Sequence, residues 1–375
     1  MAGIYIHIPF CRKACHYCNF HFSTQTNNID SFVEALLKEI VLRKEYITQP
    51  IQTIYFGGGT PSLLSNHQLS LIVDALKAQY ALADTIEFTV EANPDDISLE
   101  KLQFWKSIGI NRLSIGIQSF QKEALEWMNR AHDVEQSHQS IQLAQELGFN
   151  NLSIDLIYGT PHYSNDHLLA DLAIIKDYKI PHVSCYALTI EEKTALHSMI
   201  QKGTIKNIVN EDQATHFEIV VEQLNDTGFE HYEISNFAKP GHRSKHNSNY
   251  WKGIPYLGLG PSAHSFNRKS RQWNLANNHL YIQSIANGIV PFEIENLDIA
   301  TRYNEYMMIS LRLLEGFSMN EIEKRFGEAY VQHTKQIVEP FILEEKIIPT
   351  INGYTIAKNA RFLADGIASD FFIVD

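Results

Sequence analysis

The first half of the chain alternates short apolar segments with amphipathic ones, and this alternation constrains the fold more than any other feature. Strands are predicted at Gly3–Ile8, Thr53–Phe56, Ile86–Val90, Arg112–Ile117, Leu152–Ile157 and Val183–Ala187. Each is nearly continuous in apolar residues, as expected for strands that are covered on both faces. Parallel neighbours need crossover connections, which the intervening helices supply. Six strand–helix units are too few for a closed eight-fold barrel, so we expect an α/β fold, a partial (β/α)6 parallel barrel.

Capping signals mark several helix ends. Asp30 is the expected N-cap of the first helix, and Ser65 with Gln68 reads as a capping box. Gly109 and Gly148 stand where left-handed C-terminal caps are expected.

The pattern changes after about residue 200. A helix (Asp212–Leu224) and a strand (Glu230–Ile234) are followed by a Gly-, Pro-, Asn- and His-rich stretch, Lys239–Arg271, which we expect to be irregular. From Asp298 a separate module is predicted, with helices at Tyr303–Leu314 and Ser318–Phe326, a further helix, and a hairpin at Ile347–Ala357 that turns at Asn352-Gly353. This order resembles a small winged-helix fold. The expected domains are residues 1–235, 236–297 and 298–375.

Composition excludes some classes of function. The chain has 31 basic and 43 acidic residues among 375, a net charge of −12. This balance argues against nucleic-acid binding, which usually needs a basic surface. No apolar run approaches the roughly 18 residues of a membrane span. Polar residues in the first fifteen positions argue against a secretory leader, so we expect a protein of the reducing cytoplasm.

Three of the four cysteines, Cys11, Cys15 and Cys18, lie within eight residues. A disulfide framework would not crowd three thiols into one loop of a large cytosolic chain. Zinc would need a fourth ligand, which His16 or His21 could provide. The favoured interpretation is a 4Fe-4S cluster held by three thiolates, with one iron left open. The fourth cysteine, Cys185, lies in an apolar strand and is expected to be a buried core thiol.

Further motifs stand at or just beyond the carboxyl ends of the predicted strands, where such a barrel places its site. They are Gly57-Gly-Gly-Thr-Pro61, Glu91-Ala-Asn-Pro94, Gly116-Ile-Gln-Ser-Phe120, Arg130 in the next helix, and Asp155-Leu-Ile-Tyr-Gly-Thr-Pro161. Glycines in such a turn let the backbone approach a ligand closely. An arginine can bind a carboxylate as a bidentate fork, and carboxylates can accept from hydroxyl or ammonium groups. Taken singly, these residues could equally be loop caps or solvated charges.

With the CX3CX2C spacing, these motifs resemble the radical S-adenosylmethionine (SAM) family, and within it the branch of oxygen-independent coproporphyrinogen III oxidase-like proteins. The resemblance implies that the open iron binds SAM and that the cluster supplies the electron that cleaves it. It also implies which residues contact SAM: Tyr5, Tyr17, Gly58, Gly59, Thr60, Glu91, Gln118, Arg130 and Asp155. His7, beside the cluster strand, is expected to lie one layer behind these contacts. No catalytic residue is predicted.

The chain departs from the oxidase pattern at two points. Position 20 is Phe20 where the oxidase has a fourth cysteine, and the chain begins almost at the first strand. Instead it carries His246-Asn-Ser-Asn-Tyr250-Trp251, an HNxxYW pattern that resembles the HemW-type haem chaperones.

The HNxxYW pattern suggests a haem contact. His246 on an exposed loop is the expected haem ligand, with Tyr250 and Trp251 against the porphyrin. Arg243 and Lys245 could pair with the haem propionates. The alternatives are that this loop only packs over the barrel, or that His264 is the ligand.

The resemblance therefore implies a protein that binds a 4Fe-4S cluster, SAM and haem and transfers haem to acceptor haemoproteins. Membrane respiratory enzymes could be among these acceptors, reached by transient peripheral contact with the membrane. Whether radical chemistry takes place in this role is open. The rival hypotheses are oxygen-independent oxidation of coproporphyrinogen III and a radical SAM reaction on an unrelated substrate.

Overall fold

The computed structural model describes residues 1–205 and 210–374. They form two compact units, which are treated separately here. Unit 1 comprises Met1–Gln223 and Ser244–Glu295, and unit 2 comprises Leu224–Arg243 and Asn296–Asp375. Within the described ranges, no helix is both long and apolar enough to cross a lipid bilayer.

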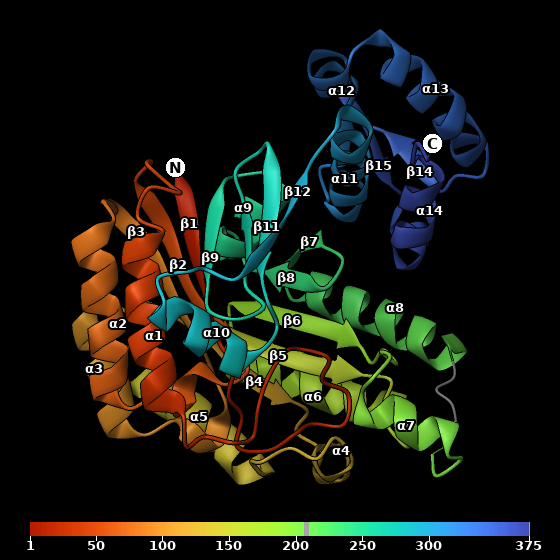
Figure 1. The fold of residues 1–375 in the computed structure, drawn as a ribbon. Helices are drawn as coiled ribbons and strands as arrows, with labels where there is room; N and C mark the ends of the chain where they lie inside the picture. Colours follow the sequence, from red (N-terminus) through yellow and green to blue (C-terminus); the bar gives the residue numbers. More distant parts are fainter. Residues whose placement is uncertain (206–209, 375) are drawn as a thin grey trace. The chain divides into compact units, whose positions relative to one another are not determined.

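Unit 1 is built on a curved parallel sheet (Figure 1). Its six parallel strands follow one another in chain order, as predicted, and each hydrogen-bonds to the next. They are β1 (Ala2–Ile8), β2 (Ile51–Gly58), β3 (Leu82–Ala92), β4 (Arg112–Gln118), β5 (Leu152–Tyr158) and β6 (His182–Ala187). The partial barrel expected from the sequence is therefore confirmed.

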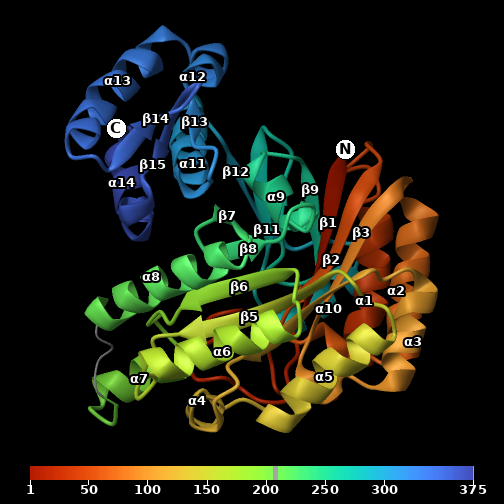
Figure 2. The same cartoon turned by 180° about the vertical axis from the view of Figure 1, so that it is seen from behind.

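Helices connect these strands and cover the outside of the sheet (Figure 2). They are α1 (Ile29–Leu42), α2 (Asn66–Gln79), α3 (Leu99–Ile108), α4 (Lys122–Trp127), α5 (Val134–Glu146), α6 (Asn165–Asp177), α7 (Ala195–Gln201) and α8 (Asn210–Asp226), whose last residues, from Leu224 on, are counted in unit 2. The capping box of Ser65 with Gln68 is confirmed. Gly109 and Gly148 adopt positive φ values of 103° and 74° at helix ends, as predicted. The expected N-cap at Asp30 is wrong. The cap position is Asn28, and Asp30 lies inside the first turn of α1, where a carboxylate is also favourable beside the helix dipole.

Side chains alternate along each barrel strand, so the two faces of the sheet have different surroundings. In β1 the side chains of Ile4, Ile6 and Ile8 are fully buried on one face. Gly3, Tyr5 and His7 occupy the opposite face, because successive residues of a strand point to opposite sides. Tyr5 lies over the ring of Tyr55 from β2, with 6.2 Å between the centroids. This second face is the inner face of the barrel.

The stretch Lys239–Arg271 contains regular structure, so the expectation of an irregular segment is wrong. It includes α9 (Lys245–Trp251), β9 (Tyr256–Leu259), β10 (His264–Phe266) and the start of β11 (Ser270–Asn274), and α10 (Asn278–Ala286) and β12 (Phe292–Asn296) follow. The four strands extend the barrel sheet beyond β1 in the order β12-β11-β10-β9-β1. Each strand is too short for its periodicity to stand out. Of the glycines that suggested a loop, Gly241 and Gly253 flank α9, and Gly258 lies within β9. Residues 244–295 thus belong to the same compact unit as the barrel.

Unit 2 combines a hairpin with a small helical module. The hairpin is β7 (Glu230–Glu233) and β8 (Asn236–Ala238). The module contains α11 (Ile299–Arg312), β13 (Phe317–Ser318), α12 (Met319–Phe326), α13 (Glu328–Leu343), β14 (Ile347–Pro349), β15 (Gly353–Ile356) and α14 (Ala364–Asp370), with the strands in the order β13-β15-β14. Ser318 caps α12 by accepting from the backbone N–H of Glu321. The helices and the hairpin expected from the sequence are present around a core that includes Tyr303, Phe317 and Ile322.

Candidate cofactor site at the carboxyl ends of the barrel strands

The three clustered cysteines lie on the loop between β1 and α1, directly after the carboxyl end of β1. All three are free and half-buried. Backbone hydrogen bonds hold the loop: Cys11 N–H donates to Ser23 O at 3.0 Å, and His16 N–H donates to Met128 O at 3.2 Å. The loop is therefore shaped by the protein itself and presents three thiols from one short segment.

Burial favours the protonated form of two of these thiols, Cys11 and Cys18. Burial raises the pKa of Cys11 to about 12, although the Thr60 hydroxyl, which donates to Cys11 Sγ at 3.4 Å, opposes this shift. Burial also raises the pKa of Cys18. Because metals bind the thiolate form, loading a cluster here must release protons.

The alternative of a zinc site gains no support from the neighbouring histidines. His16 Nδ1 lies 2.7 Å from Trp127 O, and His21 Nε2 lies 2.7 Å from Asn278 Oδ1, so one nitrogen of each ring is engaged. Among the residues that the structure describes, no group of three His, Cys, Asp or Glu side chains is close enough to hold a single metal ion. An iron–sulfur cube is wider than one ion, so its thiolates stand further apart.

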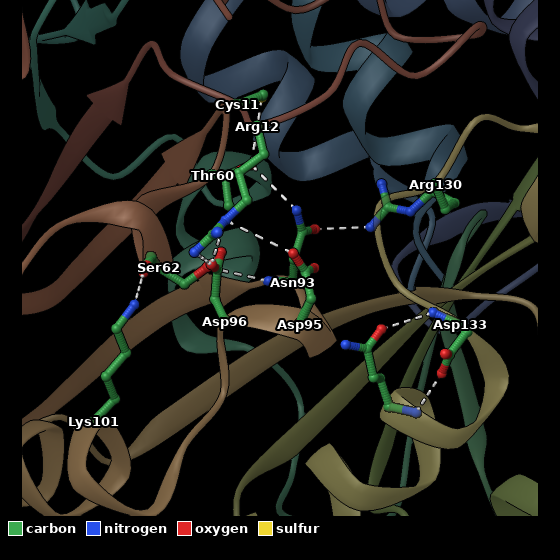
Figure 3. A network of polar contacts seen from close by, with 11 residues as sticks. Cys11, Arg12, Thr60, Ser62, Asn93, Asp95, Asp96, Lys101, Arg130 and Asp133 are labelled. Atoms are coloured by element: carbon green, nitrogen blue, oxygen red, sulfur yellow. Dashed lines mark hydrogen bonds and ion pairs between the residues drawn. The ribbon is translucent and has the colours of Figure 1, made fainter. Parts of the chain in front are cut away.

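Arg130 lies between α4 and α5, not in a helix as predicted, and it joins the cysteine loop to the ends of β3 and β4. Figure 3 shows its contact with Asn93. Its Nη1 donates to Cys15 Sγ and to Tyr17 Oη, both at 3.3 Å. Its Nη2 donates to Asn93 Oδ1 and to Gly116 O, both at 2.8 Å. The Nε of the same guanidinium is buried and has no hydrogen-bond partner among the residues that the structure describes. A cationic group beside the thiols with an unsatisfied buried donor fits an anionic ligand at this place.

The turn after β3 ties the cysteine loop to the glycine turn after β2, and this network was not predicted (Figure 3). Asn93 Nδ2 donates to Thr60 Oγ1 at 3.4 Å, and Asn93 N–H donates to Ser62 Oγ at 3.2 Å. Asp96 accepts from Ser62 Oγ at 2.7 Å and from Arg12 Nη2 at 2.6 Å. The available signal was Arg12, a cation between two candidate cluster ligands that needs a carboxylate partner.

Two carboxylates face the inside of the barrel below this network. Glu91 accepts from Tyr55 Oη at 2.7 Å, and Asp155 accepts from Ser114 Oγ at 3.2 Å. Burial raises the pKa of Glu91 to about 7, and the nearby Asp155 adds to the shift. Burial also raises the pKa of Asp155. Tyr5 lies beside them, and its hydroxyl hydrogen-bonds to His7 Nδ1 at 3.2 Å. Such a pair suits a ligand that brings an ammonium group or hydroxyl groups.

The glycines after β2 are required by packing within the protein. Gly58 has a φ of +102°, and a Cβ there would lie 2.5 Å from the ring of His7. A Cβ on Gly59 would lie 2.7 Å from the carbonyl oxygens of both Ile8 and Phe10. The turn therefore packs directly on β1 and the start of the cysteine loop, and this holds Thr60 against Cys11.

Gln118 is placed by a buried aspartate that the sequence did not single out. Gln118 has a positive φ of 67° at the end of β4. Just beyond it, Asp171 on α6 accepts from Ser119 Oγ at 2.7 Å, from Phe120 N–H at 3.2 Å, and from Gln121 Nε2 and Tyr163 Oη. Asp171 is fully buried, so these hydrogen bonds fix the loop that carries Gln118.

The structure contradicts the expected exposure of His246. It lies on helix α9, is 2% exposed, and points into the inner face of the barrel. Its Nδ1 lies 2.7 Å from Thr53 Oγ1 and its Nε2 lies 2.9 Å from Tyr250 Oη. The ring stacks on Tyr55 at 5.0 Å, and burial lowers its pKa to about 3. Apolar barrel walls and two hydrogen-bond partners make the buried position favourable, so no ring nitrogen is available to a metal in this conformation.

The other residues of the haem hypothesis differ in their surroundings. Tyr250 and Trp251 are half-buried on α9, and His264 is exposed on β10. Arg243 lies in unit 2, where it pairs with Glu230 at 3.1 Å and with Glu315 at 2.7 Å. Lys245 is exposed at the start of α9. Cys185 is 3% exposed, which confirms the expected core thiol.

Comparison with known proteins places the chain in a family. It is 38% identical to the "Heme chaperone HemW" of Bacillus subtilis over 88% of this chain and 87% of the relative. It is 35% identical to the protein of the same name from Escherichia coli over 70% of this chain and 69% of the relative. The chain belongs to the HemW family. The expected resemblance is thus confirmed.

The HemW family assignment agrees with the arrangement of units. The sequence pattern of the Radical SAM superfamily matches residues 5–175, within the barrel, and that of the HemN C-terminal domain matches residues 297–350, within unit 2. Among solved structures, the fold is similar to that of coproporphyrinogen III oxidase (HemN) from Escherichia coli, with a TM-score of 0.86, covering 99% of this chain and 89% of that chain. The sequence identity is 22%, so this likeness concerns the fold alone.

Proposed function

We propose that this protein is a cytoplasmic haem chaperone that binds haem and passes it to acceptor haemoproteins, including membrane-bound respiratory ones. The observation that carries the proposal is the similarity, over most of both chains, to several proteins named as haem chaperones. Position 20 supports it further. Phe20, which stands where the oxidase has a fourth cysteine, is 65% exposed on the cysteine loop.

We further propose that Cys11, Cys15 and Cys18 hold a 4Fe-4S cluster. Three half-buried free thiols on one loop fit this group, and the unsatisfied Nε of Arg130 beside them fits an anion bound next to it. The cluster would supply an electron and one open coordination position. Apart from Arg130, the chain contributes Thr60, which donates to Cys11 Sγ and keeps that ligand in place.

SAM would occupy the inner end of the same site. Arg130 and Tyr17 would meet its carboxylate, and Glu91 and Asp155 would accept from its ammonium and ribose hydroxyls. Tyr5, Gly58, Gly59, Thr60 and Gln118 would line the remainder. With a pKa of about 7, Glu91 is half ionised near neutrality, and a cationic ligand would favour its charged form.

The test is a titration of ferric haem into the anaerobically reconstituted, cluster-loaded protein. We expect a Soret shift that saturates, together with transfer of the haem to an apo-haemoprotein. The matched assay supplies coproporphyrinogen III and SAM and measures protoporphyrinogen. Robust product formation without a haem-dependent Soret shift would overturn the proposal in favour of the oxidase. Loss of iron and sulfide in Cys11→Ala, but not in Cys185→Ala, tests the cluster assignment.

A further inference from the structure

The sheet extension β9–β11 carries a set of side chains that continues the inner face of the barrel. Residues that pair across neighbouring strands share a face. Gly3 of β1 pairs with Tyr256 of β9, Tyr256 pairs with Phe266 of β10, and two residues earlier on β10 His264 pairs with Trp273 of β11. We call this surface, formed by Tyr256, His264, Phe266, Arg271 and Trp273, the ribbon face. It is continuous with the face that carries Tyr5, in the candidate SAM site.

His264 differs from His246 in the property that matters for a metal ligand. Its side chain is exposed, and none of the hydrogen bonds within the described part of the chain involves its ring nitrogens. Partial burial and the charge of Arg271 lower its pKa, so the ring is neutral at pH 7. A neutral imidazole with an available nitrogen is the form that binds haem iron.

The surroundings of His264 suit a flat aromatic ligand with acidic groups. Trp273 flanks the imidazole, with 6.0 Å between ring centroids and 29° between the planes, and its indole N–H donates to Glu293. Phe266 and Tyr256 extend the aromatic surface, with 6.2 Å between their centroids. Arg271 pairs with Phe266 across the strands and adds a cation to the same face. A metalloporphyrin presents a planar apolar ring, an iron that accepts a nitrogen ligand, and carboxylate groups.

Hydrogen bonds from buried side chains hold the opposite face of this extension, and they keep the backbone of the ribbon face in place. Arg43, the C-cap residue of α1, donates to Gln272 Oε1 at 2.8 Å. Glu39, fully buried on the same helix, accepts from Gly260 N–H at 2.8 Å and from Asn274 Nδ2 at 2.7 Å. These contacts fix the backbone on both sides of His264.

From these observations we infer that, within the haem chaperone function proposed above, His264 is the axial haem ligand and the ribbon face is the haem-binding surface. His246 is then a positioning residue. It hydrogen-bonds to Tyr250, whose ring meets Tyr256 edge-on at 4.5 Å, so the HNxxYW motif supports the ribbon face from below.

The experiment is a ferric haem titration of the full-length, cluster-loaded protein and four variants. His264→Ala is expected to weaken binding about tenfold or more and to move the Soret band, and added imidazole restores the wild-type band. His264→Tyr is expected to give the spectrum of phenolate-ligated ferric haem. His246→Gln is expected to weaken binding less and to keep the wild-type band position. His67→Ala, at an exposed histidine on α2, is the matched control and leaves both unchanged.

The possible results separate the ligand assignment from the function. A wild-type band in His264→Ala, or loss of that band in His246→Gln, overturns the assignment of His264 while haem binding itself stands. Absence of any Soret shift in the wild-type protein defeats the proposed function. Urea unfolding followed by tryptophan fluorescence shows that each variant is folded, and His264→Tyr provides a gain of signal that a misfolded protein could not give.

Discussion

Protonation of His246 provides a sharp test of its buried position. Burial lowers its pKa from 6.5 to about 3, with the charge of Arg112 as a smaller cause. The unfolded chain therefore binds a proton on this residue below pH 6.5, while the folded protein does not until about pH 3. Folding stability is fully present above pH 6.5 and falls as the pH decreases through that value.

The size of the effect follows from the two pKa values. At pH 5, roughly 1.5 units below the pKa of His246 in the unfolded chain, proton binding stabilises the unfolded state. Each unit corresponds to about 1.4 kcal/mol, so the free energy of unfolding falls by about 2 kcal/mol. The group is fully buried, so solvent screening does not reduce this figure much. Between pH 7 and pH 5, His246→Gln should therefore lose about 2 kcal/mol less free energy of unfolding than the wild-type protein.

The assay is urea unfolding at pH 7 and pH 5, followed by tryptophan fluorescence. All four tryptophans, at positions 105, 127, 251 and 273, lie in unit 1, so the signal reports the unit that contains His246. His67→Gln is the control, because its exposed ring is in water in both states. If the wild type and His246→Gln lose the same free energy of unfolding between pH 7 and pH 5, the buried position is refuted and His246 must lie at the surface.

Three further substitutions test the architecture of the site. Gly58→Ala should destabilise unit 1 by about 2–4 kcal/mol in urea unfolding, because it combines a positive φ with a Cβ 2.5 Å from His7. Asp171→Asn should weaken SAM binding several-fold in calorimetry, since one oxygen that accepts from the Gln118 loop becomes a donor; unchanged affinity would contradict the anchoring role. Glu39→Gln should lower the free energy of unfolding by about 1–3 kcal/mol, because a carboxylate oxygen that accepts buried hydrogen bonds becomes an amide donor. Burial raises the pKa of Glu39, so the wild type loses stability as the pH rises above 4, whereas the Gln variant does not titrate; the cost measured by urea unfolding should therefore be larger at pH 4 than at pH 7.

The barrel was predictable because two independent sequence signals mark its strands and the helices between them. Strands covered on both faces are almost wholly apolar, and the helices between them carry their own capping signals, such as Ser65 with Gln68. The sheet extension was not predictable by the same route. Its strands have three to five residues, and the whole stretch that contains most of them is rich in glycine, proline and asparagine, so composition indicated a loop.

Some residues of the candidate site could be predicted from the sequence, and others could not. Residues that stand in motifs at strand ends could be named from the sequence, because topology brings all carboxyl ends of a parallel sheet together. Asp96 and Asp171 could not, because their roles depend on partners such as Ser62 and Ser119, which are 34 and 52 residues away in the chain. A hydrogen-bonded aspartate on a helix has no sequence pattern that distinguishes it from a solvated one.

The two histidines show why a motif does not by itself identify a ligand. His246 lies in a recognisable pattern, and a recognisable pattern can reflect packing as well as binding. Here both ring nitrogens are satisfied by Thr53 and Tyr250, and breaking these bonds to reach an iron would leave buried polar groups without partners, at a cost of about 1–3 kcal/mol each. His264 lies in no comparable pattern, yet its ring is exposed on an aromatic surface, so ligation there breaks no buried hydrogen bond. The physical difference between them is access, which only the fold determines.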